Sequence, residues 1–174
     1  MRATRLALLA PLLCPSLPAV ADDDAITRAR RLCAAAGVEV VVVRDLGGII
    51  AAAYDHGRDR ILINLGSGHW RNAEARHAHG HAIGLYSSGH PDHVIRHEIG
   101  HEKFYRHVGL ARAALLRGEA PGLPRGRIAA SVSSLAATDA IEFAAEVYAG
   151  IWAGKAYPDD VTSCYSRLWH GPYD

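Results

Sequence analysis

The spacing of apolar and polar residues divides the chain into a strand-rich first part and a mainly helical remainder. Residues 24–36 place apolar side chains on one face at helical spacing and end before Gly37, which predicts a helix. The valine-rich residues 38–44 and residues 49–54 flank a pair of glycines and predict a hairpin. A second turn leads into residues 60–65, so the pattern predicts three strands in a meander.

Helical patterns dominate the second half of the chain. Residues 91–108 begin with proline and aspartate and stop at a glycine, which predicts a long helix. A shorter helix is predicted at residues 110–117, and a further one at residues 138–154, which are helix formers throughout. The remaining residues, 155–174, are rich in Pro, Asp and Ser, and we interpret them as an irregular segment that wraps around the surface of the domain.

The segment between the strands and the long helix, residues 66–90, has no clear period but many histidines. Three interpretations stay open: a surface loop, a wall of a cleft, or an auxiliary metal-binding stretch. On an extended strand the alternating histidines would share one face. The histidines of this segment are His69, His77, His79, His81 and His90.

Length and composition favour one globular domain. The chain has 174 residues, of which 49% are hydrophobic and 21% are charged, which is too charged for a membrane bundle. Its formal net charge of +1 gives no electrostatic footprint for nucleic acid. We expect a monomer whose partner is a peptide or protein substrate.

The N-terminus has the pattern of an export signal. Arg2 and Arg5 precede an apolar run that prolines interrupt, and Ala19-Val20-Ala21 is a small-residue cleavage motif. The run is too short to span a bilayer. We therefore expect residues 1–21 to be a signal peptide and residues 22–174 to be the mature, secreted or periplasmic protein, with no membrane attachment after cleavage.

Cleavage leaves two cysteines, Cys33 and Cys164. In an exported protein an even pair predicts a disulfide. A bridge between them would close a loop of roughly 130 residues and stabilise the fold by about 4 kcal/mol.

The segment His97-Glu98-Ile99-Gly100-His101 carries the most specific chemical signal. Residues four apart on a helix lie one turn apart on one face, so His97 and His101 can share one Zn²⁺. Glu98 follows the first histidine directly, where its carboxylate can take a proton from a zinc-activated water. This is the HExxH pattern of zinc-dependent peptidases. A solvated helix that carries these residues by chance is the alternative.

A catalytic zinc needs a third protein ligand and an open position for water. His107 stands six residues after His101, but Phe104 occupies the position where a chain reversal would need glycine, so on an unbroken helix His107 points away. The only methionine is Met1, so no methionine turn can lie beneath the metal. Glu142, on the separate predicted helix, is therefore the stronger candidate.

Glu146 lies one helical turn after Glu142 and can accept the N–H of His97 or His101, which fixes the ring tautomer. The alternatives are a capping box between Asp139 and Glu142, and an exposed helix charge for Glu146. The apolar residues around both glutamates favour a buried helix, in which a carboxylate needs a partner.

The segments HEIGH and TDAIEFAAEVYAG resemble the zincins of the anthrax-lethal-factor-like and Pro-Pro-endopeptidase group, whose third ligand is a Glu in the form E-x-x-A-E-x-F/Y. Glu142 matches that ligand and Glu146 the following glutamate. The resemblance implies an α+β, small zincin-like domain with an N-terminal twisted mixed sheet, an active-site helix, an edge strand along the cleft and a helical C-terminal half. It also implies endopeptidase activity on an extended peptide.

One position departs from that group, whose members carry an oxyanion-stabilising tyrosine seven residues before the Glu ligand. This chain has Leu135 there, and the role can pass to Tyr105, Tyr157 or a loop histidine. We expect a secreted zinc endopeptidase with Glu98 as general base. The alternative is an exported metal-binding or binding protein on a catalytically degenerate zincin scaffold.

Overall fold

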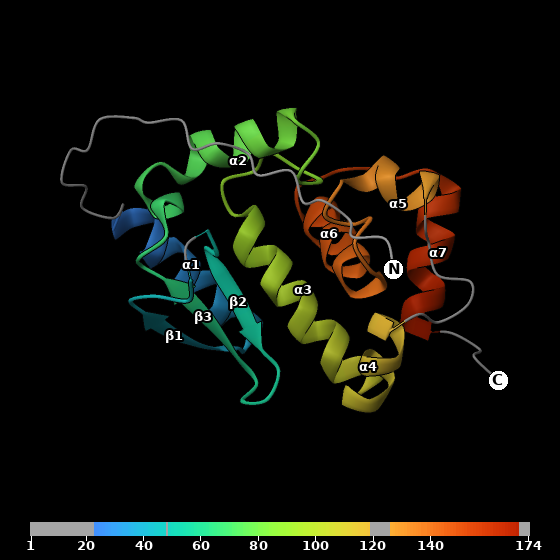
Figure 1. The fold of residues 1–174 in the computed structure, drawn as a ribbon, viewed down its shortest axis with the longest axis horizontal. Coiled ribbons are helices and arrows are strands. Elements are labelled where there is room, and N and C mark those ends of the chain that lie inside the picture. Colours follow the sequence, from blue (N-terminus) through green and yellow to red (C-terminus); the bar gives the residue numbers. More distant parts are fainter. Residues whose placement is uncertain (1–22, 48, 119–125, 171–174) are drawn as a thin grey trace, which may run out of the picture.

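The computed structural model describes residues 23–47, 49–118 and 126–170 (Figure 1). The expected signal peptide lies outside these residues. The fold is α+β, as the sequence predicts: a three-stranded mixed sheet is followed by a mainly helical second half. In chain order the elements are α1 (Asp23–Ala36), β1 (Glu39–Val43), β2 (Ala52–Asp55), β3 (Arg60–Asn64), the 3₁₀ helix η1 (Gly68–Arg71), α2 (Ala73–Ala82), α3 (His93–Val108), α4 (Leu110–Gly118), α5 (Arg127–Val132), α6 (Ala140–Trp152) and α7 (Asp159–His170).

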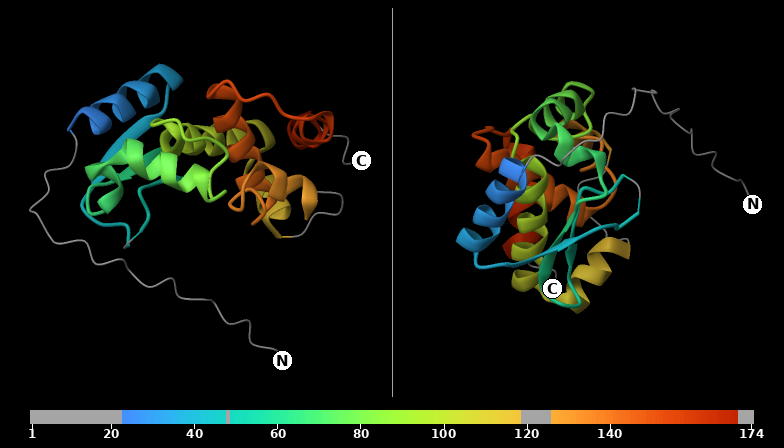
Figure 2. Two further views of the ribbon diagram at one scale, coloured as in Figure 1. Left: turned by 90° about the horizontal axis from the view of Figure 1, so that it is seen from above. Right: turned by 90° about the vertical axis from the view of Figure 1, so that its left-hand side faces the viewer.

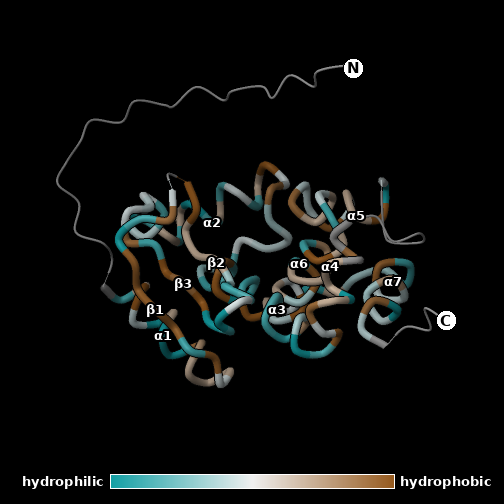
Figure 3. Tube along the Cα trace, turned by 60° about the horizontal axis from the view of Figure 1, so that its bottom comes forward, coloured by the Kyte–Doolittle hydropathy of each residue, from teal (hydrophilic) through white to brown (hydrophobic). Residues whose placement is uncertain are grey.

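The sheet has the order β1-β3-β2, with β1 parallel and β2 antiparallel to β3. The predicted β1–β2 hairpin is therefore wrong. Strand β3 lies at the centre of the sheet because its Ile61 and Ile63 are fully buried. Strand β2 ends in the partly exposed Tyr54 and Asp55 and lies at an edge. Figure 3 shows the hydrophobic character of β1 and β3.

Helix α3 runs between the sheet and the C-terminal helices and belongs to two hydrophobic clusters (Figure 1, Figure 2). Its first half gives Val94 and Ile99 to a cluster with α1 and the sheet. Its second half gives Phe104 and Tyr105 to a cluster with α4, α5, α6 and α7. The chain is thus built around this one helix.

Two predictions for the ends of the chain are wrong. The tail forms helix α7, whose Val161 and Leu168 are fully buried, because apolar residues recur there at helical spacing. Cys33 and Cys164 are free thiols rather than a disulfide. They cannot pair in this fold because Cys33 is buried in the cluster of the sheet and Cys164 in the cluster of the C-terminal helices.

Candidate metal centre

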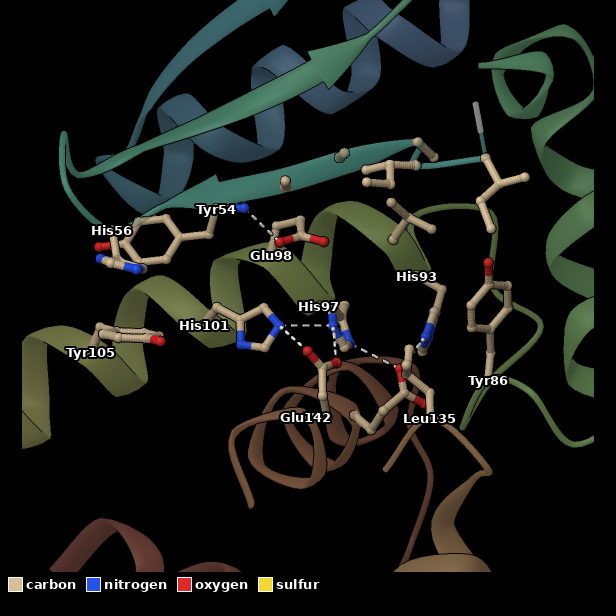
Figure 4. A pocket seen from close by; sticks show the side chains of 17 residues that line it. Tyr54, His56, Tyr86, His93, His97, Glu98, His101, Tyr105, Leu135 and Glu142 are labelled. Carbon is tan, nitrogen blue, oxygen red and sulfur yellow. Dashed lines mark hydrogen bonds and ion pairs between the residues drawn. The ribbon is translucent and has the colours of Figure 1, made fainter. Parts of the chain in front are cut away.

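Three side chains from α3 and α6 meet at the centre of the molecule (Figure 4). The Nε2 atom of His97 lies 3.1 Å from Oε2 of Glu142, and Nε2 of His101 lies 3.5 Å from Oε1 of the same carboxylate. The two Nε2 atoms are 2.9 Å apart. One nitrogen from each histidine and one oxygen from the glutamate therefore lie within 4.8 Å of one another.

The close approach of α3 and α6 depends on Gly100, between the two histidines. A Cβ at this position would lie 3.0 Å from the Cα and 3.3 Å from the carbonyl oxygen of Ala145. Asp139 caps α6 by accepting hydrogen bonds from the backbone N–H groups of Ile141 and Glu142. Glu142 thus stands in the first turn of α6, while its side chain contacts the histidines.

This donor set fits a zinc ion. Catalytic zinc is held by three protein ligands, and His₂Glu is one of the sets found in hydrolases. Bonds of about 2.0–2.1 Å in tetrahedral geometry place two ligand atoms about 3.3 Å apart, which is close to the separations here. Burial by itself lowers the pKa of His97, but hydrogen bonds with Glu142 and Glu146 raise it well above its ordinary value. The two carboxylates therefore favour positive charge at this position.

Glu146 is fully buried on the side of His97 that faces away from Glu142, and it accepts several hydrogen bonds. Its Oε1 lies 2.9 Å from Nδ1 of His97 and 2.8 Å from Nε2 of His93. Its Oε2 accepts hydrogen bonds from the backbone N–H of Ser87 at 2.6 Å and from the hydroxyl of Ser133 at 2.8 Å. Burial raises the pKa of this carboxyl, but the hydrogen bonds with both histidines outweigh it and hold the pKa below its usual range. Glu146 is thus a satisfied, buried anion rather than an exposed helix charge.

His93 was not among the site residues expected from the sequence. It stands one turn before His97 on the same face of α3. Its ring is almost fully buried, and its Nδ1 lies 3.1 Å from the hydroxyl of Ser88. His93, His97 and Glu146 form a second group with ligand atoms within 4.8 Å of one another, which shares His97 with the first. The spacing of four residues to His97 is the signal that could have found it.

The side chain of Glu98 points toward the sheet and not toward Glu142. Its Oε2 accepts a hydrogen bond of 2.8 Å from the backbone N–H of Tyr54 in the edge strand β2. Burial is the largest cause that raises the pKa of Glu98 above its ordinary value, and the neighbouring histidines oppose it. The carboxylate therefore lies between β2 and the histidine pair, in a cleft of about 410 Å³. The side chains that line this cleft include His93, His97, Glu98, His101, Tyr105, Leu135, Glu142 and Glu146.

The alternating histidines of this segment lie on helix α2 rather than on an extended strand, so His77, His79 and His81 do not all share one face. His77 is buried in α2, where its Nδ1 lies 2.6 Å from the carbonyl oxygen of Ala73 and its Nε2 accepts the N–H of Val94. His77 thus caps the N-terminus of α3, which Asp92 does not cap with its side chain. His79 and His81 are exposed.

The remaining candidates separate by position. His107 lies at the far end of α3, with its Nε2 2.5 Å from the carbonyl oxygen of Trp169, and does not line the cleft. Leu135 does line the cleft, so the position of the missing tyrosine faces the site but is apolar. Tyr105 lines the cleft one turn after His101, whereas the hydroxyl of Tyr157 lies behind it, 3.5 Å from the carbonyl oxygen of Glu146.

No protein-family model, curated protein or solved structure matches this chain. Within the three described ranges, no helix combines the length and the apolar character that a membrane span requires. The structure thus provides a buried His/Glu cluster, compatible with a metal ion, at the centre of an α+β fold.

Proposed function

We propose that the protein is a zinc-dependent endopeptidase in which His97, His101 and Glu142 hold the metal and Glu98 is the general base. The observation that carries the proposal is the convergence of these three ligand groups next to a buried glutamate in one cleft. We further propose that the protein is exported, acts as a monomer on peptides or proteins, and binds neither nucleic acid nor membranes.

When bound, zinc would lower the pKa of a water molecule and polarise the peptide carbonyl. Glu98 accepts the proton of the attacking water and passes it to the leaving amine. Its position suits this role, because the N–H of Tyr54 holds one carboxylate oxygen and leaves the other for the proton. Glu146 fixes the tautomer of His97 from behind.

The edge strand β2 offers backbone groups to an extended peptide. The carbonyl of Ala51 accepts the N–H of Asn64 on the β3 side, whereas the N–H of Tyr54 points to the opposite side, toward Glu98. Because backbone groups alternate along a strand, those of Ala52 share the side of Tyr54. A substrate strand added here would lie between β2 and the histidine pair.

Tyr105 is the group that we propose for the developing oxyanion. It lies on the same face of α3 as His97 and His101, one turn beyond them, and lines the cleft. It stacks against His56 of the β2–β3 turn, with ring centroids 5.2 Å apart and planes at 12°. This contact holds the phenol on the cleft wall, where a hydroxyl donor stabilises negative charge.

A second candidate function is metal binding without catalysis, on a degenerate zincin scaffold. The observation that favours it is Leu135, which places an apolar side chain where the related group has a phenol. The two functions share the metal centre and differ in turnover.

The test measures zinc content and peptide cleavage on the same purified protein. We expect one tightly bound zinc per chain and cleavage of unstructured peptides. Glu98→Gln should keep the zinc and lose cleavage, while Glu142→Ala should lose both. Stoichiometric zinc without cleavage of any peptide in a diverse library would favour the binding protein, and a chain without zinc would refute both functions.

A further inference from the structure

Half of the exposed large apolar side chains in the described part of the chain, four of eight, lie at the cleft or in the cavity next to it. Ile49 is 96% exposed, Ile83 62%, Ile50 44% and Leu85 37%. A cluster of this kind beside a catalytic cleft indicates a surface that becomes covered when a partner binds.

A second cavity of about 590 Å³ continues the cleft at one end. Ile49 and Tyr86 line both spaces, and η1 and α2 close the second one. The ring of Tyr86 lies directly against Gly80, where an added Cβ would come within 2.5 Å of it. Tyr86 is thus packed as a fixed wall between the two spaces.

Backbone hydrogen bonds hold the opposite wall in place. The N–H of Ser134 donates to the carbonyl oxygen of Gly84 at 2.8 Å, and that of Leu135 donates to the carbonyl oxygen of Leu85 at 3.3 Å. These bonds bring two segments that are distant in sequence into one apolar surface. The surface is therefore preformed, which reduces the entropy lost when a ligand covers it.

The charges of the second cavity have one sign. Arg76 lines it together with His69 and His79, and none of the described residues that line it carries a carboxylate. Burial lowers the pKa of His69 to about 4, so its ring is neutral at pH 7, and Arg76 is the permanent charge. A basic side chain in this cavity would meet like charge, whereas an aliphatic one would cover the apolar walls.

We propose that this end of the cleft is a substrate subsite that binds a large aliphatic side chain and rejects a basic one. The inference rests on the proposed peptidase function and adds the substrate class. Ile49 precedes Tyr54 by five residues, so at about 3.3 Å per residue the subsite lies roughly three to five residues from the cleaved bond. Antiparallel pairing with β2, the more stable arrangement, places that side chain on the C-terminal side of the bond.

The test uses the zinc-loaded protein and one cleaved peptide, in which each residue around the cleavage site is replaced in turn by Leu, Ser or Lys. We expect one position, three to five residues after the cleaved bond, where Leu gives a kcat/KM about 10-fold or more above Ser, as burial of a leucine side chain predicts. Lys should fall below Ser at that position. The double variant Ile49→Ser/Ile83→Ser should bring Leu to within about threefold of Ser.

The matched control is Leu110→Ser/Ile151→Ser, which removes two exposed apolar side chains outside both spaces and should keep the preference. Equal rates for Leu and Ser at every position, or a preference that survives the first double variant, would overturn the subsite. Binding of the same peptides to Glu98→Gln, followed by fluorescence anisotropy, separates the two proposals. Preferential binding of the Leu peptide without cleavage by the unmodified protein would keep the subsite and refute the peptidase.

Discussion

One oxygen of Glu146 lies 2.9 Å from Nδ1 of His97 and thereby determines which nitrogen of that ring faces the cleft. A carboxylate only accepts hydrogen bonds, so Nδ1 donates to Glu146, and Nε2 is the nitrogen left to bind a metal ion beside Glu142. His101 has no such partner: its Nδ1 is buried and makes no hydrogen bond within the described residues. The two histidines are thus oriented by different means, His97 by a buried anion and His101 by packing.

Glu146→Gln should weaken zinc binding by about 10- to 100-fold, the range expected for partners of metal-bound histidines. The amide keeps the shape of the carboxylate but loses its charge. Both oxygens of Glu146 accept hydrogen bonds, and the NH₂ group that replaces one of them cannot accept. Competition with a chelating dye measures the affinity. Glu74→Gln, on the exposed side of α2, is the control and should leave the affinity unchanged. Equal affinities for both variants would contradict the orienting role.

Gly100→Ala should destabilise the fold by about 1–3 kcal/mol, because the methyl group has to push α6 away from α3. The same shift moves Glu142 from the histidines, so zinc affinity should fall as well. Urea unfolding and zinc titration check the two effects. At an exposed helix position the same change stabilises by about 1 kcal/mol, so an increase in stability would show that the helices do not meet at Gly100.

Tyr105→Phe should lower kcat by about 10²-fold with little change in KM, as loss of one oxyanion donor predicts. The phenyl ring keeps its stacking on His56, so zinc content should stay the same. Tyr165→Phe removes a phenol outside the cleft and serves as the control. A kcat equal to that of the unmodified protein would exclude this hydroxyl from the reaction.

The metal-free protein should lose stability as the pH falls below 6.5. Burial is the largest cause that lowers the pKa of His77 to about 3 and that of His69 to about 4, from an ordinary value of 6.5. Nearby positive groups contribute to the same values: His69, His93 and Arg28 for His77, and Arg76 and His93 for His69. The unfolded chain therefore binds these protons first, and the stability contributed by the neutral rings is complete above pH 6.5 and is lost toward pH 4.

Each such proton contributes a slope of about 1.4 kcal/mol per pH unit, which urea unfolding in chelator at several pH values can measure. His77→Gln should reduce the slope by about one proton, and His79→Gln, exposed on the same helix, should not change it. Identical slopes for the two variants would contradict the assignment.

The sequence predicted the fold class because helix and strand periods are local. Glu142 and Glu146 were recognised because their spacing of four residues and their apolar neighbours are visible in one segment. The order of the strands was not predicted correctly. Whether β1 pairs with β2 or with β3 depends on the burial of Ile61 and Ile63 against α1 and α3, which no local pattern shows.

The expected contact of Glu146 with His97 is confirmed, but its two serine partners were missed for the same reason. Ser87 and Ser133 approach the carboxylate from two loops that no local pattern connects. The disulfide prediction treated Cys33 and Cys164 as an isolated pair. It could not take into account that α3 divides the interior into two clusters, with one cysteine in each.

The position of the ligands relative to the two hydrophobic clusters affects how the protein unfolds. The ligand histidines lie on the helix that both clusters share. Glu142 lies on α6, whose Ile141, Phe143 and Val147 are buried in the C-terminal cluster. A cation held by all three would link α3 to α6, because α6 could not leave α3 without releasing it. Metal loading should therefore raise the temperature at which α6 separates from α3, which calorimetry with and without a chelator can measure.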